Sequence, residues 1–338
     1  VTEIGSSAFG SCTKLKSVTL SNSLNAIADD AFYHCKNLTS ITIPQSVTKI
    51  GVGAFNGCTS LESMVIPNSV TEIGSSAFGS CTKLKSVTLP NAIKEIKDMT
   101  FTGCTSLESI VIPNTVTTIG SSAFNYCSSL KSITIPSSVN YIDQNAFCEQ
   151  GDECSVYISD IEAWLGIDFK GKYANPLYKS STSATSNLYL NGELLERLEV
   201  PVSVTKIKPY AFDGCSSLKI VSIPNAVTVI NPGAFDGCKN IEEVYSYATT
   251  PLDLWYNNFD SNFNTATLYV PFASIEQYKT ADYWKNFTTI KPMGTLLSDD
   301  KGVDNGVYEK ENLIYWRENM TAGSYATFCL PFEKREYW

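Results

Sequence analysis

Apolar residues recur along most of this chain in one pattern that returns every 23 residues. Residues 47–67 carry it as V-x-x-I-x-x-x-A-F-x-x-C-x-x-L-x-x-M-x-I-P, with mostly small or polar residues elsewhere. One such unit cannot bury its own apolar side chains, whereas stacked units cover each other. The pattern therefore predicts a repeat solenoid. Its phenylalanine falls at Phe9, Phe32, Phe55, Phe78, Phe101, Phe124, Phe147, Phe212 and Phe235.

The two halves of each unit predict different local structure. The last part of the unit, with Leu61, Met64 and Ile66, alternates like a half-buried strand and ends at Pro67, which lacks the donor for a continuing ladder. Further on, Gly74 permits a tight corner before a short helical turn at residues 77–78. We therefore expect a leucine-rich-repeat-like, right-handed coil of parallel β-strands and short helical turns, with strands about 4.8 Å apart.

The repeat, written as ITIPQSVTKIGVGAFNGCTSLESMVIP, resembles the BspA-like leucine-rich repeats of bacterial surface proteins. The resemblance covers roughly residues 1–292. It implies an exported, surface-attached binding protein, because some members of that family are adhesins for host matrix proteins. The motif consists of core residues, so the resemblance assigns no ligand site to particular positions here.

The predicted solenoid spans residues 1–292 and departs from its period in two places. Residues 155–201 predict one oversized coil, and residues 241–292 predict a terminating coil and cap. Residues 293–338, which include YATFCLPF, resemble the incomplete start of a β-rich module that follows such arrays.

Local signals place short elements inside these irregular parts. In the oversized coil, Asp160 is expected to cap a short helix, and Asn191-Gly192 favours a type I′ turn between two strands. In the terminating coil, Ser274 followed by Gln277 predicts a capping box that begins a helix.

Eight of the eleven cysteines occupy a single repeat position. Their side chains should point in parallel, which disfavours disulfides and predicts buried free thiols that donate weakly to turn carbonyls. Cys148 and Cys154 leave this register and flank the loop EQGDE, where a local disulfide and two free thiols are both open. No C-x-x-C pair starts a zinc site. The eight are Cys12, Cys35, Cys58, Cys81, Cys104, Cys127, Cys215 and Cys238.

Composition narrows the classes of partner. The net charge is -9 and no basic run occurs, which argues against binding to nucleic acid or an anionic membrane. No apolar run reaches the roughly 18 to 20 residues of a membrane span, and Val1 falls inside a repeat. We expect an extracellular, cell-surface protein whose export signal and cap lie upstream of this sequence.

Catalytic chemistry has few candidates. The single histidine, His34, is expected to be exposed and without a role. A Ser-His-Asp or Cys-His mechanism would therefore lack the histidine that serves as its base. Adjacent carboxylates such as Asp29-Asp30 and Asp299-Asp300 indicate solvated turns. The run DDKGVDNG lacks the ligand spacing of an EF-hand. We therefore predict no enzyme, no cofactor and no metal.

The outward strand positions predict a flat and neutral surface strip. Residues 1–20 and 70–89 are identical, which indicates block duplication and favours an extended binding surface over a single pocket. The strip is also consistent with a solvated face that keeps the sheet soluble. Its two columns are Ser17, Ser40, Ser63, Ser86, Ser109 and Ser132, and Thr19, Thr42, Val65, Thr88, Val111 and Thr134.

Three functions follow from these features. The first is a surface interaction protein that binds host or bacterial polypeptides along an extended face. The second is a carbohydrate-binding protein, and the third is a structural stalk that displays the C-terminal module. The sugar hypothesis depends on aromatic rings at Trp164, Tyr173, Tyr178, Trp255, Tyr256, Tyr283 and Trp284.

If the chain has one specific site, we expect it on the oversized coil, because irregular loops on a rigid scaffold commonly carry binding residues. The candidate ligand-binding residues are Trp164, Asp168, Tyr173 and Tyr178. Helical spacing of Ile161, Trp164 and Leu165 favours the alternative that Trp164 fills the coil's own core.

Overall fold

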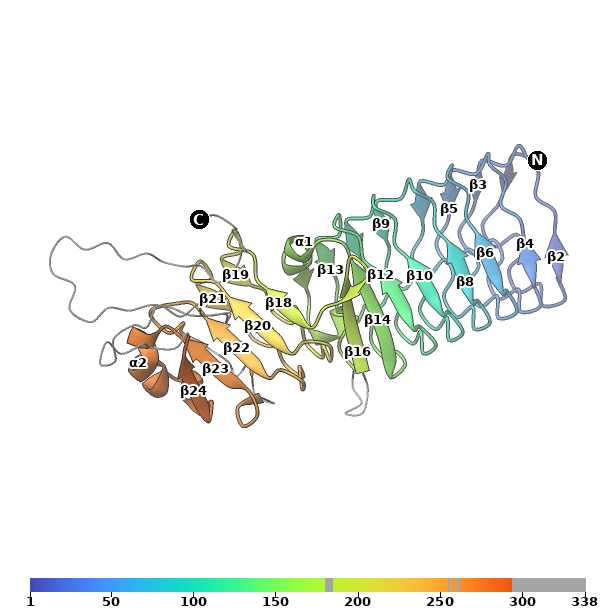
Figure 1. The fold of residues 1–338 in the computed structure, drawn as a ribbon. Coiled ribbons are helices and arrows are strands. Elements are labelled where there is room, and N and C mark those ends of the chain that lie inside the picture. The colour runs from blue at the N-terminus through green and yellow to red at the C-terminus, as the bar shows by residue number, and fades with distance from the viewer. Residues whose placement is uncertain (180–184, 255, 257, 260–261, 294–338) are drawn as a thin grey trace, which may run out of the picture.

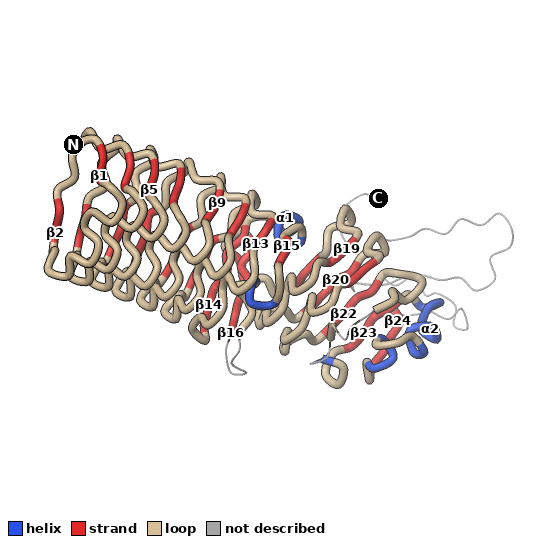
Figure 2. Tube along the Cα trace, turned by 180° about the vertical axis from the view of Figure 1, so that it is seen from behind, coloured by secondary structure: helices blue, strands red, loops and turns tan. Residues whose placement is uncertain are grey.

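The computed structural model describes residues 1–179, 185–254, 256, 258–259 and 262–293. The chain winds into a parallel-strand β-solenoid of about 12 turns with little helix, as the repeat predicts. Figure 1 shows the coils stacked one on another, with strands on two sides of the coil and a change in the direction of the stack between β16 and β18. Figure 2 shows the same array from behind. Residues 294–338, and with them nearly all of the predicted C-terminal module, lie outside the described residues.

Each regular coil contributes one strand to each of two series. The first series consists of β2 (Ser17–Val18), β4 (Ser40–Ile41), β6 (Ser63–Val65), β8 (Ser86–Thr88), β10 (Ser109–Val111), β12 (Ser132–Thr134), β14 (Glu153–Ile158), β16 (Thr185–Leu190), β18 (Arg197–Glu199), β20 (Ile220–Ile223), β22 (Glu243–Ser246), β23 (Thr267–Val270) and β24 (Thr289–Pro292). The second series consists of β1 (Glu3–Ile4), β3 (Ala26–Ile27), β5 (Lys49–Ile50), β7 (Glu72–Ile73), β9 (Glu95–Ile96), β11 (Thr118–Ile119), β13 (Tyr141–Ile142), β15 (Asp168–Phe169), β19 (Lys206–Ile207) and β21 (Val229–Ile230).

Neighbouring strands pair in parallel with the register of the repeat. In the first series Ser109 pairs with Ser132, and Ser132 pairs with Ser155. The first series is divided into shorter sheets, and one break falls between β16 and β18, where β17 (Glu193–Leu194) folds back antiparallel on β16. The core is therefore built by contacts between successive coils, as nearest-neighbour stacking requires.

The predicted short helical turns are wrong, because the segment around each repeat phenylalanine is a run of β-turns. Around Phe78, for example, the Ala77 N–H donates to Gly74 O, the Gly79 N–H to Ser76 O and the Cys81 N–H to Phe78 O. Residues two before and two after each repeat phenylalanine have positive φ, as at Ser76 and Ser80, and this excludes a helix. Gly74 itself is required by close packing, because a Cβ there would lie 2.4 Å from Val52 N.

The repeat phenylalanines form a continuous stack through the core. From Phe9 to Phe147, adjacent ring centroids lie 5.2 to 5.6 Å apart with nearly parallel planes. The stack stops at the oversized coil and resumes with Phe212, Phe235 and Phe259. Offset parallel rings are a favourable aromatic arrangement, so each phenylalanine stabilises two interfaces between coils.

The eight register cysteines are free and form a second row beside this stack. The thiol of Cys58 donates to Phe32 O at 3.2 Å, and that of Cys81 donates to Phe55 O at 3.2 Å. The same bond recurs at four further cysteines, whereas Cys215 contacts Ser217 Oγ. Cys148 and Cys154 are also free, which settles the alternative against a disulfide.

These environments predict a selective pattern of thiol labelling. Burial raises the pKa of Cys58 to about 12 and that of Cys81 well above its ordinary value, so little thiolate is present. In the native protein we expect rapid alkylation of exposed Cys12 and slow alkylation of the buried register thiols. In unreduced protein unfolded by denaturant, mass spectrometry should find all eight alkylated; any disulfide between coils would contradict this.

The oversized coil contains the predicted local elements. Helix α1 (Ile161–Leu165) begins at Asp160, whose Oδ1 accepts from Glu162 N and Ala163 N. Asn191 and Gly192 both have positive φ and join β16 to β17, as a type I′ turn requires. A 3-10 helix, η1 (Lys172–Ala174), completes the coil.

The array ends in a coil that carries η3 (Phe272–Ser274), α2 (Ile275–Thr280) and η4 (Trp284–Asn286). Trp284 and Phe287 are buried and close the last coil, as predicted. The predicted capping box is wrong, because Ser274 Oγ donates to Thr249 O at 2.6 Å and makes no cap hydrogen bond. A helix forms there, but its serine connects it to the preceding coil.

Candidate functional site

The outward side of the first strand series, which we call the strand face, is the most extended surface of the array. In its N-terminal part the outward residues are small and uncharged: Ser63 and Val65 are exposed on either side of buried Met64. The same alternation recurs on β8 and β10. This agrees with the flat, neutral strip that the sequence predicts.

Tyrosines replace these small residues in the C-terminal half. Tyr157 on β14 pairs in register with Tyr189 on β16, and Tyr245 on β22 pairs with Tyr269 on β23. All four occupy the repeat position of Val65 and are half-buried, between neighbours that point into the core. We call these four residues the tyrosine row.

Each tyrosine pair is stacked. The ring centroids of Tyr157 and Tyr189 lie 4.8 Å apart with an interplanar angle of 20°, and those of Tyr245 and Tyr269 lie 4.6 Å apart at 9°. Within each pair one face of each ring therefore covers the other. Stacking also holds the side chains in fixed orientations before any ligand binds, which reduces the entropy lost on binding.

Charged residues lie between the two pairs. The guanidinium of Arg197 is 5.8 Å from the centroid of the Tyr245 ring and also pairs with the Glu199 carboxylate. The Tyr245 hydroxyl donates to Glu243 Oε2 at 2.7 Å. Burial, followed by this contact, raises the pKa of the Tyr245 phenol, so the hydroxyl stays protonated at neutral pH.

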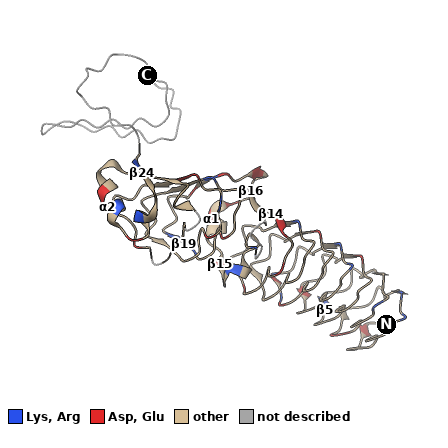
Figure 3. Cartoon of the chain, turned by 90° about the horizontal axis from the view of Figure 1, so that it is seen from below, with Lys and Arg blue, Asp and Glu red and all other residues tan. Residues whose placement is uncertain are grey.

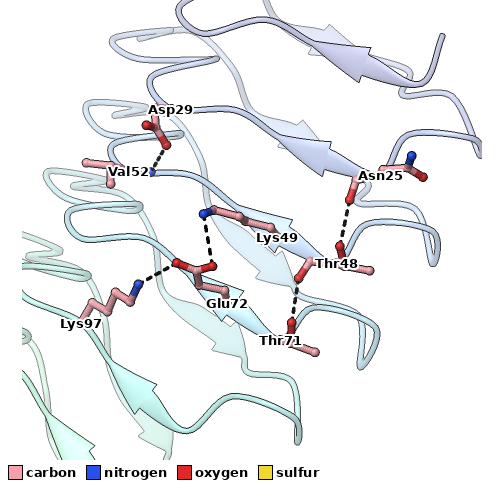
Figure 4. A network of polar contacts seen from close by, with 8 residues as sticks. All are labelled: Asn25, Asp29, Thr48, Lys49, Val52, Thr71, Glu72 and Lys97. Carbon is pink, nitrogen blue, oxygen red and sulfur yellow. Dashed lines mark hydrogen bonds and ion pairs between the residues drawn. The ribbon is translucent and has the colours of Figure 1, made fainter.

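The side of the second strand series is different, because its polar groups contact neighbouring coils (Figure 4). Glu72 accepts from Lys97 Nζ at 2.7 Å and from Lys49 Nζ at 3.2 Å, and these two cations lower the pKa of its carboxyl. The Thr48 hydroxyl donates to Asn25 O, and the Thr71 hydroxyl to Thr48 O. These contacts join successive coils.

The oversized coil uses Trp164 for its own core, which is the alternative that the helical spacing favours. Trp164 is 1% exposed and packs edge-on against Phe169. Its Nε1 donates to Ala211 O at 2.9 Å, and Asn175 Nδ2 donates to the same oxygen at 3.3 Å. In a regular coil the corresponding alanine oxygen accepts a hydrogen bond from the backbone N–H of a repeat phenylalanine, as Ala77 O does from Phe55. At Ala211 the side chains of Trp164 and Asn175 donate in place of that backbone group.

The other three predicted site residues are half-buried. Tyr173 and Tyr178 meet edge-to-face at 5.1 Å, and Lys172 Nζ lies about 5 Å from both ring centroids. Asp168 instead pairs with Lys170 Nζ at 2.9 Å. The structure thus brings Tyr173 and Tyr178 together but keeps Trp164 and Asp168 in other contacts, and the chain's own ammonium occupies the aromatic corner.

Beside this corner lies a buried carboxyl that the sequence analysis missed. Asp213 is 4% exposed, and burial, with a smaller contribution from Asp236, raises its pKa to about 8. The positive charge of Lys172 acts in the opposite direction and lowers the pKa of Asp213. The signal was visible in the sequence, since AFDGC occurs in two successive units and places Asp213 and Asp236 in adjacent coils.

This carboxyl predicts a pH dependence of stability. Between the ordinary value of 3.8 and about 8, folded Asp213 binds a proton that the unfolded chain releases. The contribution of protonated Asp213 to the free energy of unfolding is therefore complete below about pH 4 and is lost as the pH rises through about 8. Asp213→Asn should flatten that decline in urea unfolding, whereas exposed Asp253→Asn should leave it unchanged; an equal decline in Asp213→Asn would contradict the assignment.

The aromatics on which the sugar hypothesis depends do not form a flat platform in the described part of the chain. Trp164 and Trp284 are buried, and Tyr173 and Tyr178 are perpendicular. Tyr256 is exposed, whereas Trp255 lies outside the described residues. The tyrosine row was missed because its register across the oversized coil is not readable from the sequence.

His34 is half-buried, which corrects the expectation that it is exposed. Its ring stacks on Tyr33 at 4.1 Å, and Gly57 of the next coil leaves the space it occupies, since a Cβ there would lie 2.3 Å from the imidazole. Among the described residues no group of three or more His, Cys, Asp or Glu side chains is placed to hold a metal ion. None of the described helices has the length and apolar character to cross a membrane.

Comparison with known proteins supports the repeat assignment. Residues 1–104, 48–161 and 182–282 match the family described as BspA type Leucine rich repeat region, in six copies. The chain belongs to this family. Such leucine-rich repeat solenoids are generally not enzymes, and their fold suggests protein–protein interaction.

Solved structures include similar bacterial leucine-rich repeat proteins. A leucine-rich repeat protein from Bacteroides ovatus is 25% identical with a TM-score of 0.54, and the match covers 87% of this chain and 82% of that one. A leucine rich cell surface protein from Faecalibacterium prausnitzii is 27% identical with a TM-score of 0.42, covering 87% and 77%. Among curated proteins, none matches this sequence.

Proposed function

We propose that this BspA-type protein is exported to the cell surface and binds host or bacterial polypeptides through its strand face, in the manner of an adhesin. The observation that carries the proposal is the preordered tyrosine row on an extended parallel sheet. Tyrosine is enriched at protein interfaces because it supplies a large amphipathic contact area at a low cost in conformational entropy.

The contrast between the two sides of the coil supports this choice of surface. On the side of the second series, Glu72, Lys49 and Lys97 satisfy one another across three coils. On the strand face, the outward residues of β6, β8 and β10 are exposed and uncharged, so a partner that extends over these three strands desolvates little charge there.

The buried thiols are compatible with an extracellular location. Oxidation requires an accessible thiolate, and burial raises the pKa of the buried register cysteines, as at Cys104, where it reaches about 12. An oxidising environment would therefore leave these buried thiols intact, whereas Cys12 is exposed.

Carbohydrate binding is the second candidate, and the ring geometry disfavours it. A sugar stacks on an open aromatic face, whereas stacking covers one face of each ring in the pairs Tyr157–Tyr189 and Tyr245–Tyr269. The third candidate, a stalk that displays residues 293–338, is supported only by the duplicated block.

A screen of immobilised matrix proteins and glycans tests the proposal. We expect the protein to retain one or more polypeptides and no glycan, and Tyr157→Ala with Tyr189→Ala to reduce that retention. Asp168→Ala with Tyr173→Ala tests the oversized coil in parallel. Retention of glycans alone would contradict the proposal, and loss only in the second variant would move the site to the oversized coil.

A further inference from the structure

We propose that the tyrosine row binds an extended, lysine- or arginine-rich polypeptide segment, laid across the strands between Tyr157 and Tyr269. This rests on the proposed function and names the class of partner. Four features carry it: the charge between the tyrosine pairs, the exposed carboxylates, an internal guanidinium on the same surface, and the length of the row.

The part of the strand face between the tyrosine pairs is acidic. On and beside β18, β20 and β22, the outward side chains comprise four carboxylates and two cations. The carboxylates are Glu196, Glu199, Glu242 and Glu243, and the cations are Arg197 and Lys219. The corresponding column of the N-terminal coils, residues 16 to 131 at intervals of 23, contains three lysines and two glutamates. A cationic segment is therefore favoured over the C-terminal half.

Two of these carboxylates are available to a ligand. Glu196 pairs with Lys219 at 2.7 Å, and Glu199 pairs with Arg197. In the described part of the chain no ion pair includes Glu242 or Glu243, and Glu242 is exposed. Glu243 accepts a hydrogen bond from the Tyr245 hydroxyl through Oε2. Its other carboxylate oxygen, Oε1, remains available to a ligand, and the bond to Tyr245 fixes the orientation of the carboxylate.

The protein already places one guanidinium on this surface. Arg197 reaches from β18 across β20 to the ring of Tyr245 on β22, and it contacts a carboxylate at the same time. A cation over an aromatic ring beside a carboxylate is the environment that a ligand lysine or arginine needs. Figure 3 shows acidic and basic residues interspersed along the ribbon of the described residues.

The row has the length of a short peptide. β14 pairs with β16, and β18, β20, β22 and β23 pair in turn, whereas β17 folds back on β16 at the break between these two sheets. The four paired spacings of about 4.8 Å give roughly 19 Å, so a segment that spans the row needs more than about six residues of extended chain. Successive side chains of such a segment alternate in direction, so every second residue would face the sheet. In a segment of alternating lysine and serine, the lysines that face the sheet therefore recur about every 6.8 Å.

The test measures binding of two peptides of about 16 residues, one alternating Lys and Ser and one alternating Glu and Ser, each longer than the row. We expect the cationic peptide to bind at least about tenfold more tightly and to weaken as ionic strength rises. Glu242→Gln with Glu243→Gln should weaken it by roughly tenfold, as should Tyr245→Ala with Tyr269→Ala. Thr88→Ala with Val111→Ala, on the N-terminal strand face, is the matched control and should change nothing.

Equal or tighter binding of the acidic peptide would overturn the proposal, as would unchanged affinity in the Glu→Gln variant, whose substituted side chains lie outside the core. The same experiments distinguish failure of this inference from failure of the proposed function. A protein that retains matrix polypeptides but binds both peptides equally keeps its function and loses this inference; one that retains none loses the function itself.

Discussion

Phe55→Ala is expected to lower the free energy of unfolding by roughly 3 to 5 kcal/mol, because truncation leaves a cavity that the neighbouring coils cannot fill. Phe55 is fully buried, and its ring centroid lies 5.4 Å from those of both Phe32 and Phe78. One substitution therefore weakens two interfaces between coils. Urea unfolding followed by circular dichroism measures the loss.

Exposed Lys85→Ala is the matched control, since it removes a side chain from the same array without opening the core. We expect its midpoint to remain close to that of the unmodified protein. Equal destabilisation by the two substitutions would mean that the inward and outward faces have been assigned wrongly.

Trp164→Ala should destabilise the protein by a similar amount, roughly 3 to 5 kcal/mol. The indole fills the oversized coil where the phenylalanine stack is interrupted, and it also supplies a hydrogen bond to Ala211 O. Its loss opens a cavity and removes one of the hydrogen bonds that connect this coil to the next. Urea unfolding should show a lower midpoint for this variant.

Trp164→Phe separates the two contributions. It keeps most of the aromatic volume and removes only the donor, so we expect a loss nearer to about 1 kcal/mol, because Asn175 Nδ2 still donates to Ala211 O. Half-buried Tyr173→Ala should cost less than Trp164→Ala. A larger effect at Tyr173 would place the centre of this coil's packing elsewhere.

The core was readable from the sequence because one unit repeats its contacts. Phe55 and Cys58 meet the corresponding residues of the next coil, so their burial follows from the period alone. Local signals with one strong physical cause were also reliable: Asp160 caps α1, and Asn191-Gly192 has the two positive φ angles of its turn.

Other features depend on choices that the sequence leaves open. The turns around each phenylalanine need positive φ at residues such as Met99 and Tyr126, where a side chain normally resists it. Hydrogen bonds to the adjacent coil, such as Met99 N to Ser121 O at 2.9 Å, hold that backbone. Ser274 likewise could cap its helix or bond Thr249, and the contact between coils is the one that forms.

The candidate site was the least predictable part, because it depends on register across an irregular segment. Tyr157 and Tyr189 are 32 positions apart rather than 23, yet the structure places them on adjacent strands. Lys172 was not expected in the aromatic corner of Tyr173 and Tyr178, since sequence spacing does not show which cation reaches a ring.

Hydroxyl-radical footprinting of the protein with and without a retained polypeptide tests whether the tyrosine row binds the ligand, because it reports the accessibility of individual tyrosine side chains. We expect a ligand to protect Tyr157, Tyr189, Tyr245 and Tyr269, and to leave half-buried Tyr141 on the second strand series unchanged. Protection confined to Tyr173 and Tyr178, or to Tyr141, with no change along the tyrosine row would contradict it.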